Sequence, residues 1–270
     1  MPTFLCTACG TSYPEAAEPP GRCPICADER QYVPVERQRW TTPAALALGH
    51  TNAWRQREPD LFEIQTQPAF GIGQRAFLIR TPTGNLLWDC VALCDAATRA
   101  LVEALGGITG IAISHPHYYT TMQDWAAALD APVYLHARDR AWVMRPDDRL
   151  AFWEEDVRPL GPGLMLHRLG GHFPGSTVLH WAAGAAGAGA LMVGDTLQVG
   201  ADRKSVSFQW SYPNALPLSG ASVARIAARL DGLRFARIYG AFGLHIREGA
   251  DAVVRASAAR YRALLDAEQP

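Results

Sequence analysis

The segment 111–119 constrains the chain most, because an apolar run that predicts a buried strand ends there in two histidines. It reads Ile-Ala-Ile-Ser-His-Pro-His-Tyr-Tyr, so His115 and His117 are one residue apart. On an extended backbone, alternate side chains point the same way, and both imidazoles can face one point in space. A pair of this kind is also compatible with packed or exposed histidines. The strand end therefore predicts two nitrogen ligands for a metal only if further ligands follow.

Two later segments supply ligand-type residues at glycine-flanked strand ends. The first, residues 170–176, reads Gly-Gly-His-Phe-Pro-Gly-Ser and contains His172. The second, residues 191–196, reads Leu-Met-Val-Gly-Asp-Thr and contains Asp195. Together with the histidine pair, they give three imidazoles and one carboxylate.

Taken together, the three segments resemble the metallo-β-lactamase-fold superfamily, whose H-x-H-x-D-H, G-H-T-P-G-S and G-D motifs occur in this order at similar separations. The resemblance covers roughly residues 60–265 and is most specific at residues 172–176. Mixed strands and helices alone do not separate two packed sheets from a doubly wound sheet. The resemblance implies the former, an αββα sandwich of the α/β class, with a metal site at one edge between the sheets. It further implies that His115, His117 and His172 form the first metal site, beside Asp195.

The chain departs from the family at the ligands of the second metal. Where the family has the Asp-His of its first motif, this chain has Tyr119 and Thr120, which are poor zinc ligands. The late histidine of the family is also missing, since residues 239–244 read Tyr-Gly-Ala-Phe-Gly-Leu before His245. The sequence therefore predicts a mononuclear site. Whether His245 or His136, which ends another apolar strand, joins it stays open.

Four of the six cysteines form a second metal-binding pattern. They are spaced C-x2-C, thirteen residues, C-x2-C, at Cys6, Cys9, Cys23 and Cys26. Two such knuckles present four thiolates tetrahedrally, which suits a structural zinc ion. The knuckles resemble those of rubredoxins and zinc ribbons, which bind iron or zinc, whereas two disulfides are the alternative. We predict a zinc-ribbon module at 1–40, folded by its metal, and a metallo-β-lactamase-like domain at 41–270.

Composition limits the partners and the location of the protein. The 25 basic and 26 acidic residues are balanced, so neither nucleic acid nor a membrane is an expected partner. The N-terminus lacks the features of a signal peptide, which predicts a cytoplasmic protein with reduced thiols. Cys90 and Cys94 are expected to be buried thiols. A small-molecule substrate is expected, and a homo-oligomer is possible.

Local patterns predict the remaining elements. Thr42-Pro43 and Asp95 begin helices, and Thr121 with Asp124 resembles a capping box that gives Asp124 a structural role. His167 and His180, inside strands, are expected to pack rather than to bind metal. Strands are expected at 76–80, 85–91, 110–114, 132–136, 163–169, 177–181, 190–194 and 235–239, and helices at 43–48, 95–105, 123–129, 221–230 and 250–265, the last with Val254, Ala258, Tyr261 and Leu265 on its apolar face.

Three functions are compatible with this ligand set. Three neutral nitrogens and a water are a catalytic zinc pattern, which predicts a metallo-hydrolase of a small ester, lactone or thioester. Asp195 would serve as base, and Tyr118 or Tyr119 would donate to the developing oxyanion; alternatively, the tyrosines only close a vacant second site. Two histidines and Asp195 can also form an iron triad, as in the sulfur dioxygenases that the superfamily contains. The third possibility is a metal-binding protein without catalysis.

Overall fold

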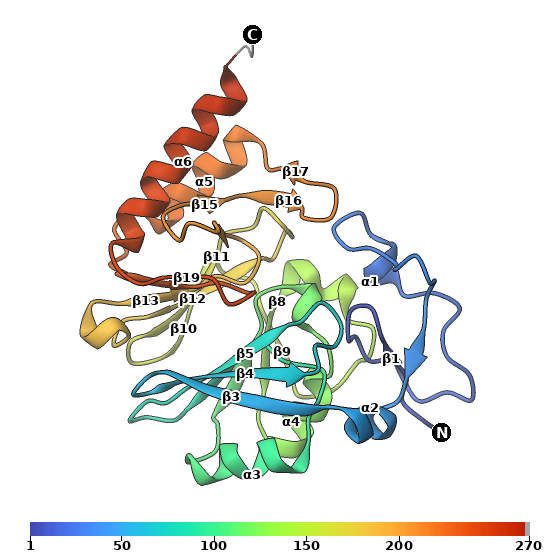
Figure 1. The fold of residues 1–270 in the computed structure, drawn as a ribbon. Coiled ribbons are helices and arrows are strands. Elements are labelled where there is room, and N and C mark those ends of the chain that lie inside the picture. The colour runs from blue at the N-terminus through green and yellow to red at the C-terminus, as the bar shows by residue number, and fades with distance from the viewer. Residues whose placement is uncertain (268–270) are drawn as a thin grey trace. The chain divides into compact units, whose positions relative to one another are not determined.

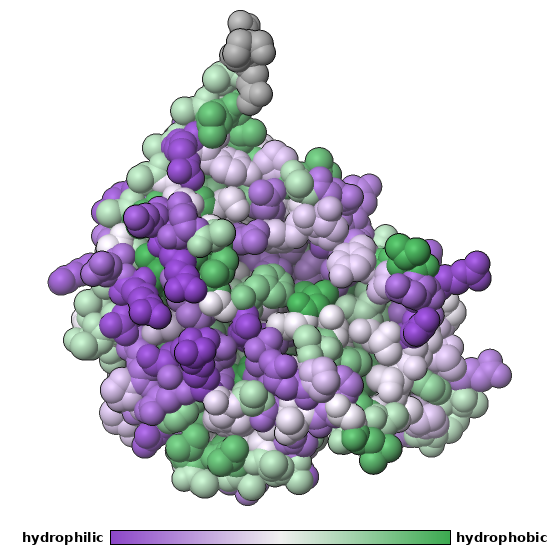
Figure 2. All heavy atoms as spheres, viewed as in Figure 1, coloured by the Kyte–Doolittle hydropathy of each residue, from purple (hydrophilic) through white to green (hydrophobic). Residues whose placement is uncertain are grey.

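The computed structural model describes residues 1–267, which fall into a first unit ending at Trp153 and a second unit beginning at Glu154. Each unit contains one mixed sheet with its own helices (Figure 1). Among the described residues, no helix is both long enough and apolar enough to cross a membrane. Hydrophilic and hydrophobic side chains are interspersed on the face that Figure 2 shows.

The first unit contains two strand groups and several short helices. Its elements are β1 (Leu5–Cys6), α1 (Pro24–Ala27), β2 (Trp40–Thr41), α2 (Pro43–Gly49), β3 (Thr51–Glu58), β4 (Leu61–Gln67), β5 (Arg75–Ile79), β6 (Leu86–Trp88), α3 (Ala96–Ala104), β7 (Gly110–Ala112), the 3₁₀ turn η1 (Pro116–Tyr118), α4 (Met122–Leu129), β8 (Val133–His136), the 3₁₀ helix η2 (Ala137–Trp142) and β9 (Leu150–Trp153).

The large sheet of the first unit has the order β3-β4-β5-β6-β7-β8-β9. Neighbours are antiparallel from β3 to β6 and parallel from β6 to β9. Every residue of β6 and β7 is buried, as expected for central strands covered on both faces. The histidine pair therefore follows directly after a strand that lies in the core.

The cysteine-containing segment is anchored to the rest of this unit. β1 pairs with β2, and Leu5 packs in a cluster with Leu46, Ala92 and Leu93. Residues 40–41 therefore belong to a strand pair next to the expected end of the module. The division into a module of residues 1–40 and a domain of residues 41–270 stays a prediction.

The second unit is built around one six-stranded sheet, ordered β10-β11-β12-β13-β18-β19. Helices α5 and α6 lie side by side (Figure 1) and share a core with the sheet that includes Val223, Ile226 and Ile238. The elements are β10 (Val157–Gly161), β11 (Leu164–Arg168), β12 (Thr177–Trp181), the 3₁₀ turn η3 (Ala185–Gly187), β13 (Ala190–Met192), β14 (Gln198–Val199), β15 (Val206–Ser207), β16 (Gln209–Ser211), β17 (Leu216–Pro217), α5 (Gly220–Leu230), β18 (Arg237–Tyr239), β19 (His245–Ile246) and α6 (Ala250–Asp266).

Local capping signals predicted several helix starts correctly. The side chains of Thr42, Asp95 and Ser219 accept hydrogen bonds from backbone N–H groups at the starts of α2, α3 and α5. The capping box at Thr121 is wrong. Its hydroxyl instead donates to backbone carbonyls of Val91 and Ala92, and Asp124 pairs with Arg145 at 2.8 Å. The long-range partners were not visible in the local pattern.

Two further expectations are corrected. The predicted apolar face of α6 includes Leu265, yet this side chain is 42% exposed, whereas Val254 and Ala258 are buried. The hairpin β3–β4 was not predicted, because polar residues occupy most of β3.

His167 is a buried packing residue, as predicted. It lies in β11 and is 7% exposed, and its Nε2 has no hydrogen-bond partner within the described residues. Burial, and secondly the charge of nearby His180, lowers the pKa of His167 to about 4. The folded protein therefore keeps this ring neutral at a pH where an exposed histidine is protonated.

We expect the free energy of unfolding to decrease as the pH falls from 6.5 to about 4. In this window the unfolded chain binds a proton at His167 and the folded chain does not, so the stabilisation is complete above pH 6.5. The loss in the free energy of unfolding that His167 causes at low pH is at most about 3 kcal/mol. Urea unfolding from pH 7 to pH 4.5 should give a flatter pH dependence for His167→Gln than for the wild type. Identical slopes would contradict the assignment.

Candidate metal centre

The four cysteine thiols of the N-terminal pattern converge on one buried point. The Sγ atoms of Cys6 and Cys26 are 3.6 Å apart, as are those of Cys9 and Cys23. All four lie within 4.8 Å of one another, and none is in a disulfide. A tetrahedral zinc site with Zn–S bonds of about 2.3 Å has sulfur–sulfur edges of about 3.8 Å. The cluster therefore fits a closed four-thiolate site.

The surroundings of the thiols favour the anionic form that a metal requires. The Tyr13 hydroxyl donates to Sγ of Cys23 and the Gln38 amide donates to Sγ of Cys6, each at 3.0 Å. Hydrogen bonds, from Cys23 first, lower the pKa of Cys6, whereas burial raises the pKa of Cys9. A buried cluster cannot hold several negative charges without a cation, so a divalent ion is the expected partner.

The histidine pair lies on a turn rather than on the strand itself. β7 ends at Ala112, and His117 belongs to η1, which the Tyr118 N–H closes on the carbonyl of His115 at 3.0 Å. The expected extended strand to residue 114 is therefore too long. The two rings still converge, with centroids 5.2 Å apart and candidate ligand atoms within 4.8 Å. Both side chains are at least 98% buried, at 1% and 2% exposure.

A buried hydrogen-bond chain orients His115, and the sequence analysis missed it. Asp89 accepts from the N–H of Ser114 at 2.7 Å and from its hydroxyl at 3.1 Å. The hydroxyl proton is then committed to Asp89, so the Ser114 oxygen accepts from Nδ1 of His115 at 2.9 Å. This places the lone pair of His115 on Nε2, the atom left to bind a metal. Nothing in the local sequence signals a contact 25 residues away.

His172 is held in the same manner by the second unit. Its Nδ1 lies 2.9 Å from the backbone carbonyl of Trp210, which fixes Nδ1 as the donor and Nε2 as the ligand atom. The loop is closed by Ser176, whose hydroxyl accepts from the N–H of Phe173 at 2.8 Å. Gly171 has φ +90°, and a Cβ there would come within 2.8 Å of Leu218. The glycine-rich sequence is thus required by the turn.

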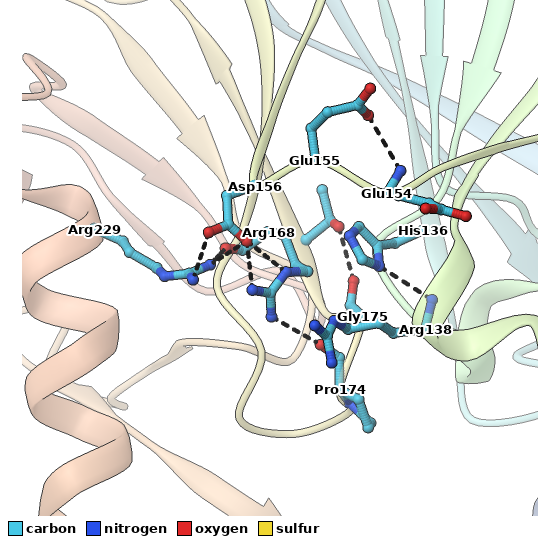
Figure 3. A network of polar contacts seen from close by, with 10 residues as sticks. His136, Arg138, Glu154, Glu155, Asp156, Arg168, Pro174, Gly175 and Arg229 are labelled. Atoms are coloured by element: carbon cyan, nitrogen blue, oxygen red, sulfur yellow. Dashed lines mark hydrogen bonds and ion pairs between the residues drawn. The ribbon is translucent and has the colours of Figure 1, made fainter.

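An ion-pair network supports this loop from outside (Figure 3). Asp156 accepts from Nε of Arg168 at 2.8 Å and from Nη2 of Arg229 at 2.8 Å. Arg168 also donates to the carbonyl of Pro174 at 3.3 Å, inside the His172 loop. Its exposure makes the network weak in energy, yet it links α5 to the loop in a defined geometry.

Asp195 follows β13 and is 4% exposed, with candidate ligand atoms of Asp195 and His172 within 4.8 Å. The Tyr212 hydroxyl donates to its backbone carbonyl at 2.6 Å, and the Tyr212 ring lies edge-on to His172 with centroids 5.4 Å apart. Burial, then the charge of Asp195, raises the pKa of Tyr212. Tyr212 is therefore a neutral donor that ties both ligand segments together.

The remaining candidate residues, two tyrosines and two histidines, make contacts of their own. Tyr118 is fully buried, with its ring 5.3 Å from that of His115, and the hydroxyl of Tyr119 lies 3.5 Å from the Asp139 carbonyl. His136 accepts from the N–H of Arg138 at 3.2 Å, and Nδ1 of His245 lies 3.3 Å from the N–H of Gly240. The catalytic roles of the two tyrosines stay predictions.

Of the two thiols outside the cluster that were expected to be buried, only Cys90 is fully so, and Cys94 is partly buried. Burial raises the pKa of both, to about 12 for Cys94. At neutral pH neither supplies a reactive thiolate.

Cys6, Cys9, Cys23 and Cys26 can therefore hold a metal ion. His115 and His117 in the first unit, and His172 and Asp195 in the second, each present candidate ligand atoms. All of these residues are buried. Four thiolates select zinc or iron, and imidazoles with a carboxylate suit zinc or iron as well. The assignment of these residues as metal ligands stays a prediction.

Solved structures show which fold carries these residues. DIM-1 metallo-β-lactamase matches 78% of this chain and 97% of its own, with a TM-score of 0.58 and 12% identity. TMB-1 matches 78% of this chain and 98% of its own, with a TM-score of 0.59 and 11% identity. The protein thus has the metallo-β-lactamase fold, and the predicted α/β sandwich with an N-terminal four-cysteine module is confirmed.

A curated sequence places the chain in a family. No model of a known protein family matches. YmaE of Bacillus subtilis (strain 168), an uncharacterized protein, is 45% identical over 270 residues, covering 99% of this chain and 98% of YmaE. The chain belongs to the same family as YmaE.

We expect Cys23→Ser to lose the metal of the cysteine group and the order of residues 1–40, because a structural zinc supplies most of the folding energy of such a module. Mass spectrometry of the metal content and limited proteolysis would measure both effects. The second unit should stay folded. Cys90→Ser, which removes a buried thiol outside the group, is the matched control. Disulfides within the group, with no metal bound, would contradict the prediction.

We also expect Asp89→Asn to weaken metal binding at the histidines by about 10- to 100-fold. The amide would turn a donor toward the Ser114 hydroxyl, which reverses the hydrogen-bond chain and moves the proton of His115 to Nε2. Chelator competition measures the affinity. Asp95→Asn, at the α3 cap where Asn and Asp perform alike, is the control. An unchanged affinity would show that the chain does not set the tautomer.

Proposed function

We propose that the protein is a metal-dependent hydrolase with one metal ion at His115, His117 and His172. Two of these ligands have partners that favour a proton on Nδ1, Ser114 for His115 and the Trp210 carbonyl for His172, and this hydrogen bonding, which places the lone pair on Nε2, is the observation that supports the proposal. When bound there, a zinc ion would supply a Lewis acid and lower the pKa of a water ligand. Asp195, grouped with the histidines, supplies the carboxylate that hydrolysis needs.

The substitutions at the second-metal ligands support a mononuclear site. Thr120 is buried, and its hydroxyl donates to the carbonyl of Cys90 at 3.3 Å. Tyr119 is also buried, and burial raises its pKa, which opposes the phenolate form that a metal would need. FIM-1 from Pseudomonas aeruginosa, with a TM-score of 0.57 and 10% identity over 78% of this chain and 96% of its own, has a structure in a mono-zinc form. The fold is thus compatible with one ion.

Asp195 is the residue that we assign to proton transfer. Its backbone is fixed by Tyr212, so the carboxylate starts from a defined position. In the forward reaction it would accept a proton from the attacking water and return it to the leaving group. Tyr118 and Tyr119 remain candidate donors to the oxyanion.

The proposed substrate is a small organic ester, lactone or thioester. In the second unit a shallow hollow, with free space of only about 20 Å³, has Asp195 and Phe242 in its lining. Its other lining side chains are mostly apolar, including Leu197, Val199 and Leu244. Such a surface favours an apolar acyl group beside the carboxylate.

We expect Asp195→Asn to lower kcat by about 10²- to 10⁴-fold while the metal is kept, because the amide cannot accept the proton. His172→Ala should remove both metal and activity. Zinc-loaded protein would be tested against lactones, thioesters, phosphodiesters and β-lactams, with metal content measured in parallel. Asp202→Asn, an exposed turn residue, is the control.

The outcomes separate the alternatives. No turnover above the His172→Ala background would favour a metal-binding protein without catalysis. Turnover only with ferrous iron and oxygen would favour an oxidoreductase. Two metal ions at the histidine group, about 3.5–4 Å apart by anomalous scattering, would contradict the mononuclear site.

A further inference from the structure

The cysteine module and the histidine turn share a buried side chain, Gln74. Its amide nitrogen donates to the carbonyl of Cys9 at 2.7 Å and to the carbonyl of His117 at 3.0 Å. Gln74 is 3% exposed, so neither bond competes with bulk water. Because an amide nitrogen has two hydrogens, both are used, one on each metal-ligand residue.

A second contact joins the same two segments. The N–H of Ser12 donates to the carbonyl of Thr120 at 2.9 Å. Gly10 has φ +81°, and a Cβ there would come within 3.4 Å of the Thr120 side chain and 3.1 Å of Ala92. The first cysteine knuckle therefore lies directly on the turn that follows His117.

The knuckle itself is shaped by its ligands. The N–H of Gly10 donates to the carbonyl of Cys6 at 2.8 Å, and the N–H of Cys6 donates to the carbonyl of Thr11 at 3.0 Å. These bonds require Cys6 and Cys9 to stay on one side of the loop, as they do when both bind one ion. Loss of that ion releases the constraint on the Cys9 carbonyl and hence on Gln74.

We propose that the two metal sites of this chain are thermodynamically coupled, with Gln74 as the positioning residue that links the cysteine site to His117. The inference rests on the proposed function in that the histidines hold a metal. Because coupling between two binding sites is reciprocal, a filled cysteine site strengthens metal binding at the histidines and the converse also holds. The cysteine module is then part of the metal centre rather than an independent appendage.

The test uses the full chain with Co²⁺ in both sites. Thiolate-bound cobalt gives charge-transfer bands that report the cysteine site, and in a second sample with Zn²⁺ in the cysteine site the ligand-field bands of added Co²⁺ report the histidine site alone. In Gln74→Met, we expect the affinity at the histidine site to fall about tenfold and its ligand-field bands to shift, with the charge-transfer bands retained. Gln74→Glu keeps the shape of the side chain but cannot donate to both carbonyls, so we expect the same loss of affinity and the same spectral shift. This variant replaces Gln74→Met in the test if Gln74→Met does not fold.

Asn85 supplies a matched control in the same unit. Its amide is buried and also donates to two carbonyls, of Leu105 at 3.0 Å and of Gly107 at 2.8 Å. Asn85→Leu loses equivalent bonds away from both metal groups, and we expect its histidine-site affinity to stay within about twofold of the wild type. If Gln74→Met and Asn85→Leu change affinity and spectrum equally, the coupling is overturned.

Hydrogen exchange tests the coupling separately from metal uptake by the histidines. We expect Cys23→Ser to speed exchange of the amides of Tyr118, Tyr119 and Met122, which are bonded within the turn, while those of α3 stay protected. Unchanged exchange at the turn would overturn the proposal. A wild type that binds metal only at the cysteines would contradict the proposed function, and the exchange result would then show separately whether the cysteine site positions the turn at His117.

Discussion

The rest of the centre depends on one constraint: in His115 and in His172, Nδ1 is hydrogen-bonded to a hydroxyl or backbone oxygen, which fixes the tautomer of the ring. A neutral histidine has a single proton to place, so fixing it on Nδ1 leaves a lone pair on Nε2. Ser114 fixes His115, and Trp210 fixes His172. Without these partners, the buried rings would sample both tautomers, and the metal would have to select the productive one at a cost in affinity.

The same logic extends to the supporting residues. Asp89 matters only because it orients Ser114, and Tyr212 matters because it holds the backbone of Asp195. Each of these contacts is long-range in sequence, and each is buried or nearly so. The position of each ligand residue therefore depends on contacts within its own unit and not on the ligand-bearing segment alone.

The sequence predicted the fold class well, because motifs of this kind combine residue type with a glycine-dependent turn, whereas the ligand residues stay a prediction. The caps of Thr42 and Asp95 were equally readable, since a cap is a contact within three residues. The failures have one cause. The 3₁₀ turn at His117, the hydroxyl contacts of Thr121 and the bridge through Gln74 depend on segments distant in the chain, which local patterns do not describe.

The conformation of Thr120 depends on the cysteine module. Thr120 stands where the family motif has a histidine, its φ of 34° is unusual for a β-branched residue, and its side chain lies against the site of a Gly10 Cβ. A longer side chain at this position would meet the knuckle that holds Cys9. Because Ser12 also binds the Thr120 carbonyl, the module fixes the backbone there as well. Packing against the first cysteine knuckle therefore fixes both the side chain and the backbone of Thr120.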